Sequence, residues 1–253
     1  MTLNDKVALI TGSSRGIGKA IALDLAAAGA HVIVHGPETS DELDASFEQV
    51  RALSPDSTKV GAELSDSHAI AAMFATIKTR FGRLDILVNN AATQNPSPFL
   101  DMKEEDWDRV LAVNLKAPFL CAQHAGRMMR DHDGGKIINI SSVHAYDVRR
   151  HYVHYNCAKG GLETLTKSMA LELAPYNIQV NSLVAGAIAT DLTPTDRCDK
   201  FLTAIPAGRI GTTEEIARMA RFLSSEACDY LTGTSITVDG GLTLGFCASR
   251  PDL

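Results

Sequence analysis

Short apolar runs rich in valine and isoleucine recur along the chain, separated by longer segments whose apolar residues follow helical spacing. A run of about four apolar residues between turn signals is typical of a strand buried on both faces, as in Val7–Ile10 and Ile86–Val88. We therefore predict seven strands, at Val7–Thr11, His31–His35, Thr58–Ala62, Ile86–Asn89, Lys136–Ser141, Gln179–Leu183 and Ser235–Val238.

The segments between these runs place apolar residues three or four positions apart, which predicts amphipathic helices. Thr212 followed three residues later by Glu215 has the form of a capping box and predicts a helix start. Pro175 marks the end of the helix before Gln179. The predicted helices are Gly16–Ala28, Asp41–Leu53, Ser67–Phe81, Glu104–Met129, Tyr155–Leu173 and Glu214–Leu223.

Alternating strands and helices predict an α/β fold with a parallel sheet, because parallel strands need crossover helices that cover both faces. We expect one domain over residues 1–253, a doubly wound sheet of about seven parallel strands with helices on both faces. The stretch Ala187–Thr203 has little periodicity and contains Thr, Asp and Pro. It predicts a long loop that acts as a substrate lid around residues 187–210.

Composition narrows the class of protein. Hydrophobic residues make up 45% of the 253 residues and charged residues 21%, which argues against disorder or a disulfide-stapled small protein. The net charge of −6 removes the general attraction to nucleic acid, and no apolar stretch is long enough to cross a membrane. The five cysteines are scattered, with no C-x-x-C pair. We expect a cytoplasmic protein with neither a nucleic-acid nor a membrane partner.

A glycine-rich loop, Thr11–Gly18 (TGSSRGIG), joins the first predicted strand to the first predicted helix. Glycines allow a tight turn and let backbone N–H groups and the helix N-terminus approach a pyrophosphate. The spacing is G-x-x-x-G-x-G. We interpret the loop as a dinucleotide site, with Gly12, Ser14, Arg15, Gly16, Ile17 and Gly18 as its cofactor-binding residues.

The second predicted strand ends in Val34-His35-Gly36-Pro37-Glu38, without the acid that commonly holds the adenosine ribose. Its absence removes a repulsion against a 2′-phosphate, and Arg15 is a candidate ligand for that phosphate or else a solvated residue at the helix start. We therefore expect the cofactor to be NAD(P), with a slight preference for NADP.

Tyr155 and Lys159 lie four residues apart at the start of a predicted helix and share one face. A tyrosine takes a proton from an alcohol only if its pKa falls from about 10, which a close ammonium favours. Ser142 ends a predicted strand, where its hydroxyl can orient the substrate oxygen. Spacing alone also fits a surface Tyr–Lys pair.

The chain contains, in order, the motifs Thr11–Gly18, Asn89-Asn90-Ala91-Ala92, Asn114, Ser142, Tyr155-Asn156-Cys157-Ala158-Lys159 and Asp239-Gly240-Gly241. Together they resemble the short-chain dehydrogenase/reductase family over essentially the whole chain. The resemblance implies a Rossmann-type domain that forms a homotetramer. It implies Tyr155 as acid/base, Lys159 as pKa modulator and nicotinamide-ribose ligand, Ser142 as substrate orienter and Asn114 as holder of a relay water. It also implies cofactor contacts from Glu63, Leu64, Asn90, Ile188 and Thr190.

Three positions depart from the family pattern. Ala92 and Ala185 replace a usual Gly and Pro, and Glu63 replaces a common Asp. An alanine at position 92 would alter cofactor affinity if that residue needs a positive φ. None of the three removes a catalytic group.

The loop between Ser142 and Tyr155 is rich in histidine and arginine, which suits a polyhydroxylated or acidic substrate. Its Ser-Ser-Val-His and Val-His-Tyr patterns resemble the glucose 1-dehydrogenase branch, which oxidises a sugar C1 hydroxyl. We predict a small-molecule sugar or polyol substrate bound by Ser142, His144, Gln94 and His151. The histidines lack an acid or cysteine to complete a metal set, so we expect no metal.

Two alternatives stay open. The chain is a 3-oxoacyl-[acyl-carrier-protein] reductase if Arg127 and Arg130 meet an acidic carrier protein instead of solvent. It is a cofactor-binding regulator if it has kept the fold and lost activity, although the intact Ser142, Tyr155 and Lys159 argue against that.

Overall fold

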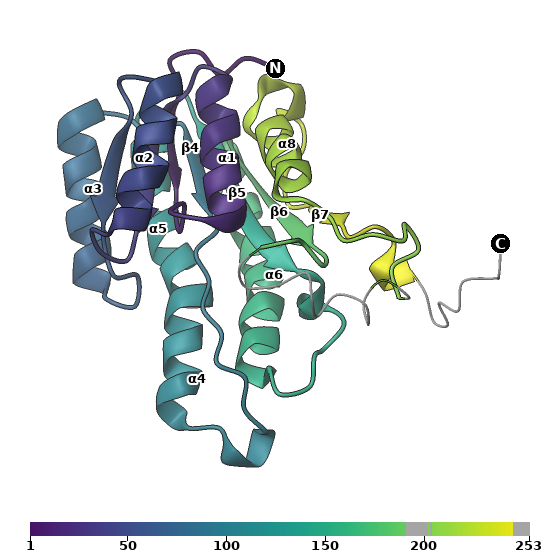
Figure 1. Ribbon diagram of the computed structural model, residues 1–253. Coiled ribbons are helices and arrows are strands. Elements are labelled where there is room, and N and C mark those ends of the chain that lie inside the picture. The colour runs from purple at the N-terminus through teal and green to yellow at the C-terminus, as the bar shows by residue number, and fades with distance from the viewer. Residues whose placement is uncertain (191–201, 203, 245–253) are drawn as a thin grey trace.

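The computed structural model describes residues 1–190, 202 and 204–244. Its centre is one seven-stranded parallel sheet in the order β3-β2-β1-β4-β5-β6-β7 (Figure 1), which confirms the predicted fold class and all seven strands. The strands are β1 Val7–Ile10, β2 His31–Gly36, β3 Thr58–Gly61, β4 Ile86–Asn89, β5 Gly135–Ser142, β6 Ile178–Ala185 and β7 Ser235–Val238.

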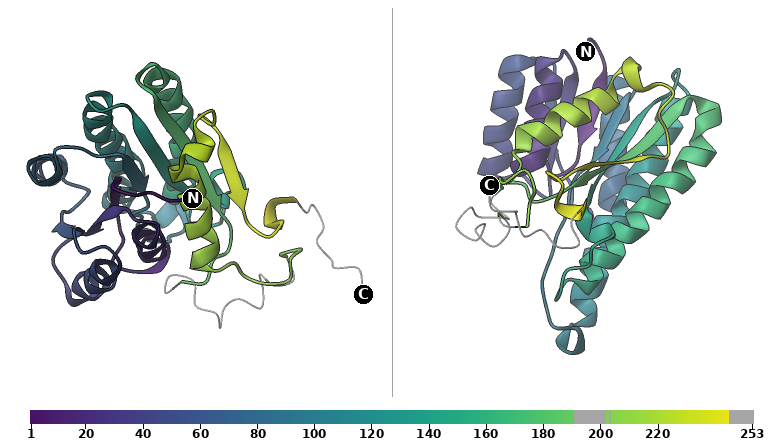
Figure 2. Two further views of the ribbon diagram at one scale, coloured as in Figure 1. Left: turned by 90° about the horizontal axis from the view of Figure 1, so that it is seen from above. Right: turned by 90° about the vertical axis from the view of Figure 1, so that its right-hand side faces the viewer.

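Helices cover both faces of the sheet. Figure 2 shows α6 and α8 on opposite sides of it, and α4 projects beyond the sheet in Figure 1. The helices are α1 Gly16–Ala27, α2 Asp41–Leu53, α3 Ser67–Phe81, α4 Glu104–Leu111, α5 Ala117–Arg130, α6 Val153–Leu173 and α8 Thr213–Ser224. The helix N-termini follow the sequence closely, and α8 begins with the predicted capping box between Thr212 and Glu215.

Alternate residues of the strands supply two separate cores, because successive side chains of a strand point to opposite faces. Ile10 and Val34 pack with α1, α2 and α8, whereas Leu9 and Ile33 pack with α3 and α5. All four are fully buried. The apolar runs of the central strands therefore reflect two buried faces, as expected for a doubly wound sheet.

One helix was predicted to be continuous, but in the structure it is interrupted. The segment predicted as a single helix, Glu104–Met129, consists of α4, a π-helical turn at Ala112–Lys116, and α5. Pro118 lies at the start of α5 and has no N–H, so the carbonyl of Asn114 lacks the donor that an α-helix would give it. Pro118 thus removes one α-helical hydrogen bond directly next to the π-helical turn.

The carboxyl edge of the sheet is stepped. Strand β4 ends at Asn89, paired with Asn139, but β5 continues for three more residues to Ser142, which pairs with Ala185 of β6. The strand order reverses between β1 and β4, and ligands of open α/β sheets bind outside the carboxyl ends at such a point. The fold thus places the glycine loop and Ser142 at one edge.

The structure describes only part of the predicted lid, and membrane-spanning helices can be sought only in the described residues. Half of the predicted lid, residues 191–201 and 203 within 187–210, lies outside the described residues. No helix in the described part of the chain is both long and apolar enough to cross a membrane.

Candidate active site

The glycine loop turns sharply from β1 into α1. Arg15 precedes the helix in extended conformation, no side chain caps the helix N-terminus, and its first turn contains no acid. The backbone N–H groups of this turn are therefore free of side-chain acceptors. An uncapped helix start that follows a glycine loop is suited to bind a pyrophosphate.

Two of the loop glycines are required by close approach. Gly12 has φ +63°, and a Cβ there would lie 2.8 Å from the Cα of Ala91. A Cβ on Gly18 would lie 2.2 Å from the carbonyl oxygen of Gly12 and 2.4 Å from Nδ2 of Asn90. The loop thus packs directly on the residues after β4, and a dinucleotide fits against this glycine surface.

The side chain of Asn90 holds this packing together. Its Nδ2 donates to the carbonyl oxygens of Thr11 and Gly12, each at 2.9 Å. Its own N–H donates to Oγ1 of Thr11 at 3.0 Å. The predicted ribose contact of Asn90 is therefore left to its main-chain oxygen, because the amide group is engaged with the loop.

His35, near the end of β2, also holds the glycine loop in place, a role that no sequence motif predicted. Its Nδ1 accepts a hydrogen bond from the Gly12 N–H at 3.0 Å, and its Nε2 contacts the Ala62 carbonyl oxygen at 3.0 Å. Nε2 therefore carries the proton. Burial lowers the pKa of His35 to about 4, so the ring is neutral near pH 7.

The adenosine end of the predicted site lies beyond β3. Glu63 accepts hydrogen bonds from the N–H and hydroxyl of Ser65, each at 3.0 Å, and Leu64 is buried beside it. These hydrogen bonds outweigh burial and lower the pKa of Glu63. Arg15 is half exposed, and its guanidinium lies 3.8 Å from the carboxylate of Glu42. Gly36, in place of an acid, brings no negative charge to this end of the cleft.

Ser142, Tyr155 and Lys159 come together at the stepped edge. Lys159 is 3% exposed, its Nζ donates to the main-chain oxygen of Ile140 at 2.7 Å, and the same nitrogen lies 5.6 Å from the centroid of the Tyr155 ring. Burial lowers the pKa of Lys159 to about 8. The pair is thus inside the protein and not on the surface.

The protein groups alone do not lower the pKa of Tyr155. Burial raises it, while the hydroxyl of Ser142 and the positive charge of Arg149 act in the opposite direction. Deprotonation of the tyrosine near neutral pH therefore needs further positive charge, such as that of an oxidised nicotinamide ring beside it.

Asn114 is fully buried in the π-helical turn. Its Oδ1 accepts from the Thr93 N–H at 2.8 Å, and its Nδ2 donates to the Thr93 carbonyl oxygen at 2.9 Å. Both ends of the amide are therefore occupied. The main-chain carbonyl, which Pro118 leaves without a helical donor, is the group that can hold a water.

The loop from Val143 to Tyr152 brings polar side chains to Tyr155. The ring of His144 lies 6.3 Å from that of Tyr155, and its Nδ1 contacts the main-chain oxygen of Asp147 at 3.0 Å. Tyr152 lies 6.4 Å from Tyr155 on another side, and the guanidinium of Arg149 stacks 4.3 Å from the Tyr152 ring. Neither Tyr152 nor Arg149 was among the predicted site residues.

Two predicted substrate residues are placed less directly. His151 is exposed with φ +70°, and it is its main-chain oxygen that binds the opposite loop, by accepting from Ser97 N–H at 2.9 Å. Gln94 is half-buried and directly follows Thr93, which Asn114 holds. His154 is buried, and its Nε2 contacts the Asn95 main-chain oxygen at 2.9 Å.

The remaining predicted residues lie around the same cleft. Thr190 approaches the glycine loop, since a Cβ on Gly16 would lie 3.7 Å from its methyl group, and Ile188 is buried. Ala92 is not among the residues with positive φ, so the alanine is unstrained there. Among residues 1–190, 202 and 204–244, no three His, Cys, Asp or Glu side chains gather as a metal site would require.

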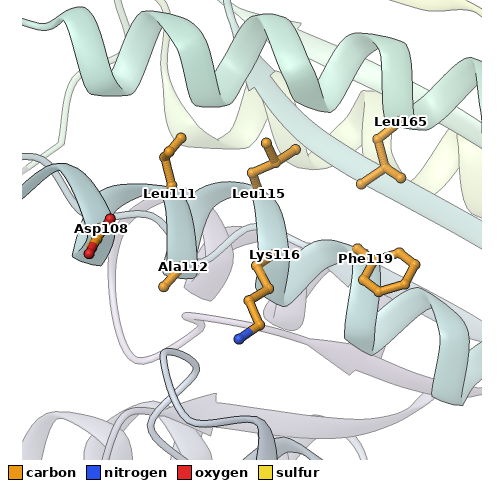
Figure 3. A pocket seen from close by; sticks show the side chains of 7 residues that line it. All are labelled: Asp108, Leu111, Ala112, Leu115, Lys116, Phe119 and Leu165. Atoms are coloured by element: carbon orange, nitrogen blue, oxygen red, sulfur yellow. The ribbon is translucent and has the colours of Figure 1, made fainter.

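An apolar hollow lies elsewhere, between α4–α5 and α6 (Figure 3). No residue of the predicted active site lines it. Its lining consists of Asp108, Leu111, Ala112, Leu115, Lys116, Phe119 and Leu165.

Comparison with known proteins gives consistent results. A family model described as Enoyl-(Acyl carrier protein) reductase matches residues 12–243. A 3-oxoacyl-[acyl-carrier-protein] reductase from Synechocystis is 38% identical over 243 residues, which is 96% of this chain and 98% of the relative.

Solved structures agree over nearly the whole chain. A short-chain type dehydrogenase/reductase from Mycobacterium marinum has a TM-score of 0.92 and 35% identity, covering 96% of this chain and 98% of the other. A gluconate 5-dehydrogenase from Burkholderia cenocepacia, solved with NADP and tartrate, has a TM-score of 0.90 and 34% identity, covering 96% and 97%.

Proposed function

The chain belongs to the short-chain dehydrogenase/reductase family, NAD(P)-dependent oxidoreductases that act on CH–OH groups, and on that basis we propose that its substrate is a sugar or polyol. The observation that carries this proposal is the polar surround of Tyr155. His144 and Tyr152 flank the tyrosine, and Arg149 stacks on Tyr152. Such a pocket offers hydrogen-bond donors and acceptors to hydroxyl groups and little apolar surface for an alkyl chain.

In this proposal Tyr155 accepts the hydroxyl proton, Ser142 orients the substrate oxygen and Lys159 stabilises the phenolate. The nicotinamide supplies the hydride chemistry when bound. The main-chain carbonyl of Asn114 holds the water that passes the proton on. Cofactor contacts are assigned to Gly12, Ser14, Arg15, Gly16, Ile17, Gly18, Glu63, Leu64, Asn90, Ile188 and Thr190, and substrate contacts to Gln94, His144 and His151.

For the cofactor we propose a preference for NADP. Gly36 stands where an acid would repel a 2′-phosphate, and Arg15 at the start of α1 supplies a cation. The gluconate 5-dehydrogenase neighbour was solved with NADP, which supports this choice.

A second candidate is a 3-oxoacyl-[acyl-carrier-protein] reductase, favoured by the name of the 38%-identical relative. Arg127 and Arg130 lie in the last turn of α5, which ends at the edge of the sheet where β5 begins. Within one copy of the chain this is the edge opposite Ser142, so these two arginines do not frame the site.

Turnover assays separate the two candidates. The purified chain is assayed with NAD and NADP, each against aldoses, polyols and sugar acids and, in the reverse direction, against acetoacetyl thioesters. Turnover of a hydroxylated sugar supports the proposed substrate, whereas turnover confined to thioesters would give the function to the second candidate. Cofactor binding without turnover would revive the regulator.

We also propose a cytoplasmic homotetramer. The hollow of Figure 3 offers Leu111, Leu115, Phe119 and Leu165 to a second copy, and Phe119 is 43% exposed in the single chain. Within the part of the chain that the structure describes, Cys121, Cys157 and Cys228 form no disulfide with one another, which suits a reducing compartment. Light scattering of the wild type and of Leu115→Glu tests the assembly; a wild-type monomer would contradict it.

A further inference from the structure

Glu163 is a buried carboxylate on α6, four residues beyond Lys159, so Tyr155, Lys159 and Glu163 follow one another along one helix face. Only 5% of its surface is exposed. A carboxylate is costly to bury unless other groups compensate its charge. No sequence motif singled it out.

Three hydroxyl groups from three separate segments donate to this carboxylate. Ser182 of β6 donates to Oε1 at 2.5 Å, Tyr146 of the loop after Ser142 donates to Oε2 at 2.7 Å, and Ser235 of β7 donates to the same oxygen. Burial raises the pKa of Glu163, but these hydrogen bonds outweigh it and the pKa is lowered. The group is therefore an anion at neutral pH.

The surroundings of Lys159 contain little other charge. Strands β6 and β7 contribute only hydroxyls to this cluster. Among the described residues, Glu163 is the one carboxylate whose charge raises the pKa of Lys159 against the effect of burial. The titratable and charged groups around the pair are Tyr155, His144, Tyr146, Arg149 and Tyr152.

We propose that Glu163 is a positioning residue of the reaction, which keeps the ammonium of Lys159 charged and, through Tyr146, fixes the loop that carries the substrate contacts. The proposal rests on the proposed roles of Lys159 and Tyr155. Burial lowers the pKa of Lys159 to about 8 and the charge of Glu163 acts against this, so loss of that charge would lower the pKa of Lys159 further. A neutral amine no longer stabilises a phenolate.

The first test measures the pKa of Lys159 directly and does not depend on enzymatic turnover. Lysine labelled at the ε-carbon is titrated by NMR in the full chain, and the Lys159 signal is assigned with Lys159→Arg. Glu163→Gln, which removes the charge at constant size, should lower the Lys159 pKa by about one unit or more. Glu163→Asp keeps the negative charge, so the Lys159 pKa in this variant should stay close to that of the wild type. Ser182→Ala removes one hydrogen bond and no charge, and should leave the Lys159 titration unchanged.

The second test is the pH profile of kcat/KM on the substrate found in the turnover assay. In Glu163→Gln the alkaline limb should move to lower pH, whereas a merely structural role would lower kcat equally at every pH. Tyr146→Phe breaks only the link to the loop, so it should raise KM and leave the alkaline limb in place.

The outcomes distinguish this proposal from the proposed function. An unchanged Lys159 titration in folded Glu163→Gln would overturn the role of Glu163 even in an active enzyme. A lowered Lys159 pKa in a chain without turnover on any compound would support the coupling and count against the proposed function. If Glu163→Gln does not fold, Glu163→Met provides the uncharged comparison at similar size, and an unchanged Lys159 pKa in it would overturn the proposal.

Discussion

The imidazole of His35 accepts a hydrogen bond from the N–H of Gly12 at 3.0 Å, so the end of β2 holds the first glycine of the loop in place. The main chains of the two segments are joined as well, since the N–H of Ser13 donates to the carbonyl oxygen of His35 at 2.8 Å. The conformation of the glycine loop thus depends on a side chain from another strand.

Replacing His35 by alanine should destabilise the chain and weaken dinucleotide binding. The N–H of Gly12 and the carbonyl of Ala62 lose their partner, at a cost of about 1–3 kcal/mol for each buried group left unpaired. Urea unfolding and cofactor titration measure the two effects. His68→Ala, at an exposed histidine, is the matched control and should change neither.

The neutral His35 also predicts how stability varies with pH. Its pKa is about 4 in the folded chain and about 6.5 unfolded. Between these values the unfolded chain binds more protons, so this contribution to stability is full above about pH 6.5 and is lost as the pH falls toward 4. Urea unfolding at several pH values should show a shallower acid-side slope in His35→Ala than in the wild type.

Tyr155→Phe should leave cofactor affinity nearly intact and lower kcat by a factor of about 10² to 10⁴, the usual contribution of a general acid or base. The phenyl ring keeps the contacts with His144 and Tyr152 and removes only the hydroxyl. Steady-state kinetics and cofactor titration check it, and near-unchanged turnover would remove the tyrosine from the chemistry.

Lys159→Ala should reduce both turnover and cofactor affinity, because one ammonium is assigned to the phenolate and to the nicotinamide ribose. It also leaves the Ile140 carbonyl without its donor. A cofactor affinity equal to that of the wild type would contradict the double role.

Arg15→Ala should weaken NADPH binding by about 1.5–3 kcal/mol, the value for a charged hydrogen bond, and leave NADH binding unchanged. Glu42→Gln removes the carboxylate that lies 3.8 Å from the Arg15 guanidinium and competes for it, so this variant should bind NADPH more tightly. Equal losses for the two cofactors in Arg15→Ala would show that the arginine does not contact the 2′-phosphate.

Pro118→Ala should lower kcat without lowering stability. The alanine supplies an N–H that can satisfy the Asn114 carbonyl within the helix, and the relay water then loses its acceptor. Thermal unfolding and kcat in the same buffer test this. A kcat equal to that of the wild type would show that the freed carbonyl has no part in proton transfer.

Local sequence patterns were sufficient to predict the sheet, most helices and the glycine loop. Buried strands, helix caps and tight glycine turns each depend on residues that are close together in the sequence. The π-helical turn after α4 interrupts an otherwise helical pattern, in which Pro118 is the one local signal of a break. The role of His35 depends on how β2, the glycine loop and Ala62 meet in space, and no pattern of adjacent residues indicates it.

The role of Glu163 could not be predicted either, because it too depends on residues that are far apart in the sequence. It looks like an ordinary helix glutamate, and its partners Ser182 and Ser235 lie 19 and 72 residues away. The ring of His144 lies 6.3 Å from that of Tyr155, and the structure also places Tyr152 near Tyr155 and Arg149 over the Tyr152 ring. The stacking of Arg149 on Tyr152 could not be inferred from their order along the chain.

The stepped edge of the sheet has a consequence for how such a protein can evolve. Because strand side chains alternate, inserting one residue into β5 would turn Ser142 to the opposite face, whereas the loop after Val143 can change in length and sequence without touching that register. New substrates can therefore be acquired by variation in this loop, while Ser142 keeps its place at the end of β5 and Tyr155 and Lys159 keep theirs on α6.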